Sequence, residues 1–76
     1  MSDILAVLGG NVKHYRARLG WTQEDLARQA GINRSYLAGI ESGRRNTSAR
    51  TIEKLARALG VSPADLLALL DVSQHE

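Results

Sequence analysis

Apolar residues recur every three or four positions along most of the chain, which is the period of amphipathic α-helices rather than of strands. The first stripe consists of Leu5, Leu8, Val12, Tyr15 and Leu19. It predicts one helix that is capped by Ser2 or Asp3 and stops at Gly20. Gly9 and Gly10 interrupt the stripe at a cost of about 1 kcal/mol each relative to alanine, so fraying before Gly10 is the main alternative.

The stretch Thr22–Glu41 predicts two short helices that meet at a glycine. Thr22 can cap the first helix, and Asp25 three residues later completes a weak capping box. Gly31 permits the backbone turn that ends this helix, and Asn33 can cap the second. The inward positions are Leu26, Ala27, Ala30, Ile32, Leu37 and Ile40. Two helices joined by a short turn with a glycine form a helix-turn-helix, whose second helix can enter a DNA major groove.

Two more helices are predicted after the segment SGRRNTS, which has no apolar residue and is expected to be a loop. Ser48 can cap the fourth helix and Gly60 can close it. The core face of this helix is expected to hold Ile52, Leu55, Ala56 and Leu59. Ser62, followed by Pro63 and Asp65, is a start signal for a fifth helix.

The whole chain is expected to be one all-α domain over residues 1–76, with a core of about 3–72 and a tail at 73–76. Its 76 residues are 43% hydrophobic, which suits a small single core that is mostly aliphatic. Without cysteine there is neither disulfide nor thiolate chemistry, as is usual for a cytoplasmic bacterial or phage protein. The apolar run at Ile4–Leu8 is too short for a signal or membrane segment.

Charge is distributed unevenly, although the formal net charge is only +2. The stretch from Arg34 to Arg50 holds four arginines and a single acid, Glu41. From Val61 onward the chain has no Lys or Arg. This asymmetry is expected if one surface meets the phosphates of a nucleic acid.

Three blocks of sequence carry a resemblance to a known family: TQEDLA, AGINRSYLAGIESGRRN and TIEKLARALGVSPADLL. In their order and spacing, these blocks resemble the helix-turn-helix family of phage repressors, Cro and their small bacterial relatives. The resemblance runs from about Val12 to Leu70. The segment RSYLAGIESGRRN also resembles the controller proteins of restriction-modification systems. The resemblance implies a five-helix lambda-repressor-like fold and a regulator that binds an inverted-repeat operator as a homodimer. Controller protein, phage-type repressor and antitoxin all remain open.

Four residues of the second motif helix share the face opposite Leu37 and Ile40 and are expected to contact bases. They are Arg34, Ser35, Ala38 and Gly39. Arg34 can form a bidentate pair with guanine, although a helix charge of this kind can also be merely solvated. Gly39 departs from the family, whose members often carry a longer polar side chain there. Its expected role is close approach of the backbone to the groove wall, with more specificity left to DNA shape.

A second group of residues is expected to contact the DNA backbone, which positions a protein without reading sequence. The group consists of Gln23, Tyr36, Ser42, Arg44, Arg45 and Asn46. Gln23 opens the first motif helix, where free N–H groups suit a phosphate, and the resemblance implies that it also buttresses the reading helix. The alternatives are an idle glutamine, a tyrosine that only covers the flank of the domain, and a loop that is only solubilising.

The resemblance also implies a partly buried ion pair between the first helix and the end of the third. Arg16 and Glu41 stand at these positions. We expect a bidentate contact that fixes the reading helix relative to the first helix.

The leucines at 66–70 exceed what one helix face can bury in so small a domain. Leu67 and Leu70 are assigned to the core. A dimer seam is predicted from Leu66, Leu69 and Val72, joined by Ile4 or Val7. A purely internal role is the alternative. A twofold dimer would set two reading helices roughly 34 Å apart, matching an inverted repeat.

Catalysis is not expected, because the only histidines, His14 and His75, lie far apart without metal-ligand or triad spacing. No metal, other cofactor, membrane or small-molecule ligand is expected; the predicted partners are double-stranded DNA and a second copy of the chain. The alternative function is a helical protein-interaction module, such as an antitoxin or anti-repressor partner, that keeps the fold with little DNA binding.

Overall fold

The computed structural model describes residues 3–69, and in this range the chain is helical without any strand. The helices are α1 (Ile4–Arg18), α2 (Gln23–Ala30), α3 (Arg34–Glu41), α4 (Ala49–Leu59) and α5 (Pro63–Leu67). The predicted all-α fold with five helices is confirmed. Among the described helices, none has the length and apolar character needed to traverse a bilayer.

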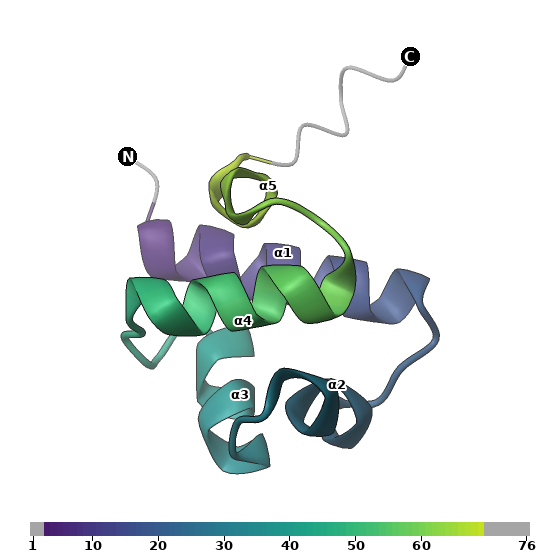
Figure 1. Cartoon of the computed structure of the whole chain (residues 1–76). Coiled ribbons are helices and arrows are strands. Elements are labelled where there is room, and N and C mark those ends of the chain that lie inside the picture. The colour runs from purple at the N-terminus through teal and green to yellow at the C-terminus, as the bar shows by residue number, and fades with distance from the viewer. Residues whose placement is uncertain (1–2, 70–76) are drawn as a thin grey trace.

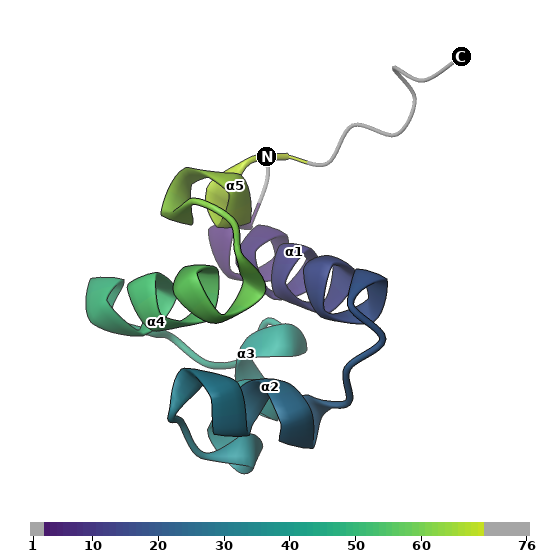
Figure 2. The ribbon, with the colours of Figure 1, turned by 45° about the vertical axis from the view of Figure 1, so that its right-hand side comes forward.

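The helices lie in three levels around α1 and α4, which form the middle of the molecule (Figure 1). Turning the view shows α5 on one side of this pair, with α2 and α3 on the other (Figure 2). α1 packs against α3 and α5, and α4 packs against α2 and α5. The core between them consists of Leu8, Val12, Leu26, Ala27, Ala30, Leu37, Ile40, Leu55, Ala56, Leu59 and Leu66. The second helix of the motif is therefore supported from behind by aliphatic contacts.

Short-range capping fixes where the helices begin and end. The N-cap side chains that accept a backbone N–H are those of Asp3, Thr22, Asn33, Ser48 and Ser62. The capping box predicted at Thr22 is complete, because Asp25 accepts in return from the N–H of Thr22. This backbone hydrogen bond lowers the pKa of Asp25. Gly31, with φ at 70°, ends α2 in the left-handed conformation predicted for it.

α1 continues without a break through both of its glycines, which have different surroundings. A Cβ on Gly9 would collide with the backbone carbonyl oxygens of Ile40 and Glu41. A Cβ on Gly10 would meet nothing within 4 Å. Gly9 is thus the point of close approach between α1 and the end of α3, whereas Gly10 is an exposed interruption.

Three predictions about leucines are wrong. Leu19 is 47% exposed, because it caps the end of α1 beyond the edge of the core. Leu67 is also exposed, while Leu66 is fully buried in the core rather than free for a dimer seam. Ser62 caps α5, and Leu66 follows this cap by four residues. An apolar residue at that position packs inward against the residue that precedes the cap, which is Val61. Leu70 and Val72 lie outside the described residues.

Asn11 is a buried polar residue for which no role was predicted. Its Nδ2 donates to the carbonyl oxygens of Leu66, at 2.7 Å, and of Ala68, at 2.6 Å. Carbonyl groups at the end of a helix lack intrahelical donors, and the side-chain amide of Asn11 donates the missing hydrogen bonds at the end of α5. The available signal was a polar residue inside the apolar stripe of α1.

Candidate nucleic-acid interface

The N-terminal end of α3 presents a basic front with an apolar back. Asn33 fixes the start of the helix by accepting from the N–H of Tyr36 at 3.1 Å. Leu37 and Ile40 are buried in the core. Arg34 and Ser35 are exposed, as expected for residues that contact a ligand. This end of α3 is therefore free and rigidly supported.

Farther along the same face, the surface is less open than the sequence suggested. Ala38 is half-buried and Gly39 is buried. The side chain of Arg45 lies across Gly39, where a Cβ would collide with it. The expected approach of the Gly39 backbone to a groove wall does not fit this arrangement, because Arg45 occupies the space in front of it.

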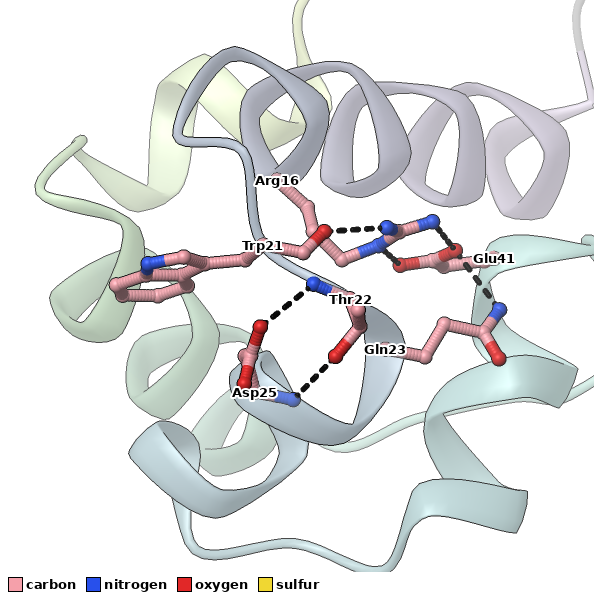
Figure 3. A network of polar contacts seen from close by, with 6 residues as sticks. All are labelled: Arg16, Trp21, Thr22, Gln23, Asp25 and Glu41. Atoms are coloured by element: carbon pink, nitrogen blue, oxygen red, sulfur yellow. Dashed lines mark hydrogen bonds and ion pairs between the residues drawn. The ribbon is translucent and has the colours of Figure 1, made fainter.

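The ion pair predicted between α1 and α3 is confirmed as a bidentate contact (Figure 3). Nε of Arg16 lies 2.7 Å from Oε2 of Glu41, and Nη2 lies 2.9 Å from Oε1. The two side chains are only 15% and 3% exposed. Nη1 of Arg16 also donates to the carbonyl oxygen of Trp21 at 2.8 Å. The hydrogen bond with Glu41 raises the pKa of Arg16.

Gln23 joins this network from the first turn of α2. Its Nε2 donates to Oε1 of Glu41 at 3.0 Å, and Figure 3 shows its side chain reaching toward the end of α3. The buttressing role implied by the family resemblance is confirmed. α1, α2 and α3 thus meet at the carboxylate of Glu41. The contact of Gln23 with a phosphate stays a prediction.

The loop after α3 is tied back to the helix by polar and aromatic contacts. The hydroxyl of Tyr36 donates to Oγ1 of Thr47 at 2.8 Å, so its proton is used within the chain. The hydroxyl of Ser42 donates to the carbonyl oxygen of Gly39 and accepts from Nε of Arg44 at 2.9 Å. The predicted contacts of this group with phosphates stay predictions.

Arg34, Arg44 and Arg45 are all exposed on α3 and the following loop. Arg44 and Arg45 line one surface hollow with Ser35, and Asn46 lines a second hollow with Arg45 and Ser35, whereas Arg34 lines a different hollow with Gln23. Guanidinium groups bind both phosphates and the acceptor edge of guanine. Among residues 3–69, no three His, Asp or Glu residues come together in a way that could hold a metal ion. The chemistry of the surface therefore suits an extended polyanion.

Comparison with known proteins gives concordant results. A family model described as Helix-turn-helix matches residues 12–66. A hypothetical transcription factor of Neisseria meningitidis is 46% identical over 65 residues, which cover 86% of this chain but only 61% of that relative. The crystal structure of the restriction-modification controller protein C.AhdI from Aeromonas hydrophila has a TM-score of 0.79 at 42% identity, covering 82% of this chain and 94% of that one. The structure of SinR, a master regulator for biofilm formation, in complex with DNA has a TM-score of 0.77 at 37% identity, covering 80% and 98%. The predicted resemblance, controller proteins included, is confirmed, and these relatives are regulators rather than enzymes.

Proposed function

This chain belongs to the helix-turn-helix family of DNA-binding transcriptional regulators, and we propose that it binds an inverted-repeat operator as a homodimer with α3 in the major groove. The observation that carries the proposal is the front of α3, where Arg34 and Ser35 are exposed while Leu37 and Ile40 are buried behind them. Helices of this motif contact base edges with their N-terminal residues. The complex of the similar regulator SinR with DNA supports the same class of partner.

Base reading and backbone binding are assigned to different arginines. Arg34, the first residue of α3, would pair with a guanine through its planar fork of donors. Arg44 and Arg45 follow the helix and would contact phosphates, as would Gln23 at the start of α2. Ala38 would touch a thymine methyl.

Arg34→Ala is expected to lose about 1–3 kcal/mol of operator binding and to relax preference at one base pair per half-site. Arg45→Ala is expected to weaken binding to all sequences alike and to reduce the salt dependence, because a phosphate contact is lost. Fluorescence anisotropy with a duplex selected from a random pool, and with its single-base-pair variants, measures both effects. If Arg34→Ala weakens every duplex equally, the assignment of base reading to Arg34 is wrong.

The salt dependence of binding to random duplex DNA separates this function from the protein-interaction alternative. Each phosphate contact releases counterions, so affinity should fall steeply as salt rises. A chain that keeps the fold without DNA binding would show little affinity even at low salt. Identifying the DNA that is protected next to the gene for this chain would then give its operator.

The proposed homodimer uses exposed apolar side chains near α5. Ile4, Leu67 and Leu69 are 56%, 42% and 67% exposed, whereas Leu66 is buried and takes no part. α1 and α5 pack together, which brings apolar positions of both helices to one region. A second copy of the chain is the proposed occupant, because an inverted repeat requires a twofold arrangement.

Leu69→Lys is expected to shift the chain toward monomer, because it places a charge in the proposed seam. Sedimentation velocity over a range of protein concentrations measures the change. Gln29→Lys, a change at an exposed residue on α2, is the control and should leave the dimer intact. A parent chain that sediments as monomer at every concentration would refute the dimer.

A further inference from the structure

Gly39 stands in the middle of α3, where glycine is unfavourable for helix formation and alanine is the best residue. The structure gives a local reason for its presence. A Cβ at this position would collide with Cγ of Arg45 and would lie 3.2 Å from its Cβ and 3.4 Å from its Cδ. Only a residue without a side chain leaves room for the aliphatic stem of Arg45 to cross the helix.

The main chain of Arg45 is anchored to the same residue. The N–H groups of Arg44 and Arg45 both donate to the carbonyl oxygen of Gly39, at 3.0 and 3.2 Å. Because the main chain of Arg45 is held in place, a side chain at residue 39 could be accommodated only if the Arg45 side chain rotated away.

The crossing stem delivers the guanidinium to an aromatic ring. The Cζ of Arg45 lies 5.2 Å from the centroid of the Tyr36 ring. The hydroxyl of Tyr36 is in turn fixed by Thr47. A guanidinium over a tyrosine face is stabilised by its attraction to the π-electrons and loses freedom of movement. The charge of Arg45 is thereby held beside Ser35 on the front of α3, with which it lines a shared surface hollow.

We propose that Gly39 is a positioning residue for DNA recognition. Because it has no side chain, Arg45 can pack against Tyr36, and this contact holds the charge of Arg45 beside Ser35 on the exposed face of α3 before DNA binds. The inference rests on the proposed DNA binding and replaces the expectation that the Gly39 backbone itself approaches the groove. Pre-arrangement matters because a side chain that is already ordered loses less conformational entropy when it binds.

A double-mutant cycle of Gly39→Ala and Arg45→Ala tests the proposal with the selected operator duplex. Gly39→Ala is expected to lower the affinity about as much as Arg45→Ala, roughly tenfold. In the chain that already carries Arg45→Ala, the further change Gly39→Ala should have no effect, since there is no longer a side chain to seat. Equal losses in both backgrounds would indicate direct approach of residue 39 to DNA and would overturn the proposal, as would an unchanged affinity of Gly39→Ala.

Gly10→Ala is the matched control, because it makes the same chemical change in a helix where the new Cβ meets nothing. It should leave the affinity unchanged, and thermal unfolding of Gly39→Ala at or above the parent temperature shows that the fold is intact. If Gly39→Ala does not fold, Tyr36→Leu replaces it in the cycle: non-additivity with Arg45→Ala supports the seat and additivity overturns it.

NMR of the free chain provides a readout that does not depend on DNA. The side-chain protons of Arg45 should show ring-current shifts from Tyr36 in the parent, and Gly39→Ala should abolish them. Shifts that persist in Gly39→Ala overturn the proposal alone. A parent chain that shows these shifts but binds no duplex at low salt instead refutes the proposed function.

Discussion

Replacing Gly9 by alanine is expected to destabilise the fold by about 2–3 kcal/mol, in spite of the better helix propensity of alanine. The added Cβ would collide with the carbonyl oxygen of Ile40 and lie 2.7 Å from that of Glu41. These are backbone atoms at the end of α3, so no side chain can rotate to relieve the collision. α1 would have to move away from α3, at the cost of contacts across the core. Thermal unfolding followed by circular dichroism should show a fall of roughly 10 °C or more.

Gly10→Ala provides the internal comparison for this effect. Gly10 belongs to the same helix and is exposed, and the new Cβ would meet nothing within 4 Å. The substitution should therefore stabilise the fold by about 0.5–1 kcal/mol through helix propensity alone. If both variants change the unfolding temperature in the same direction, the packing of α1 against the end of α3 does not require a glycine at position 9.

The contrast between these glycines also shows what the sequence could predict. Periodicity was sufficient to predict α1, because an amphipathic stripe is a local property of the chain. It could not distinguish Gly9 from Gly10, since the difference depends on residues at the end of α3 that are distant in sequence. Predictions based on caps succeeded for the same local reason, as at Thr22 and Ser48.

Predictions failed where the pattern was apolar on every side. The leucines at 66–70 offer no polar face to set their orientation, so periodicity alone assigned Leu67 to the core, whereas the spacing from the cap at Ser62 points to Leu66. The decisive contacts come from α1 and α4, which pack against α5. The role of Asn11 could not be predicted from periodicity, because its partners, the carbonyl groups of Leu66 and Ala68, come within reach only once α5 has packed against α1.

At the candidate site, the sequence predicted the exposure of the arginines but not how they are held. The exposure of Arg34 followed from the helical face opposite Leu37 and Ile40. The pair of Arg16 with Glu41 followed from resemblance to a family rather than from spacing. The position of the Arg45 side chain across Gly39 could not be predicted, because it depends on the path of the loop after α3.

Glu41→Ala is expected to cost about 3 kcal/mol of unfolding free energy, because it leaves the poorly exposed guanidinium of Arg16 without its partner. The same substitution removes the acceptor of Gln23, which otherwise links α2 to the end of α3. Denaturant unfolding measures the loss. DNA affinity should fall as well, since the end of α3 loses its side-chain hydrogen bonds to both α1 and α2. A variant that unfolds at the same denaturant concentration as the parent would refute a structural role for the pair.

The exposed ion pair between Arg28 and Asp25 is the appropriate comparison for this effect. Its N···O distance of 2.9 Å is similar, but the two side chains are 68% and 35% exposed. Arg28→Ala should change the unfolding midpoint far less than Glu41→Ala, because water screens the interaction and replaces it when it is lost. Replacing both members of the buried pair, as in Arg16→Met with Glu41→Leu, should recover much of the stability lost in Glu41→Ala, since no charge is then left unpaired. If DNA affinity nevertheless stays low in this double variant, the pair serves mainly to orient α3, and its hydrogen bonds specify the angle of the reading helix rather than the stability of the fold.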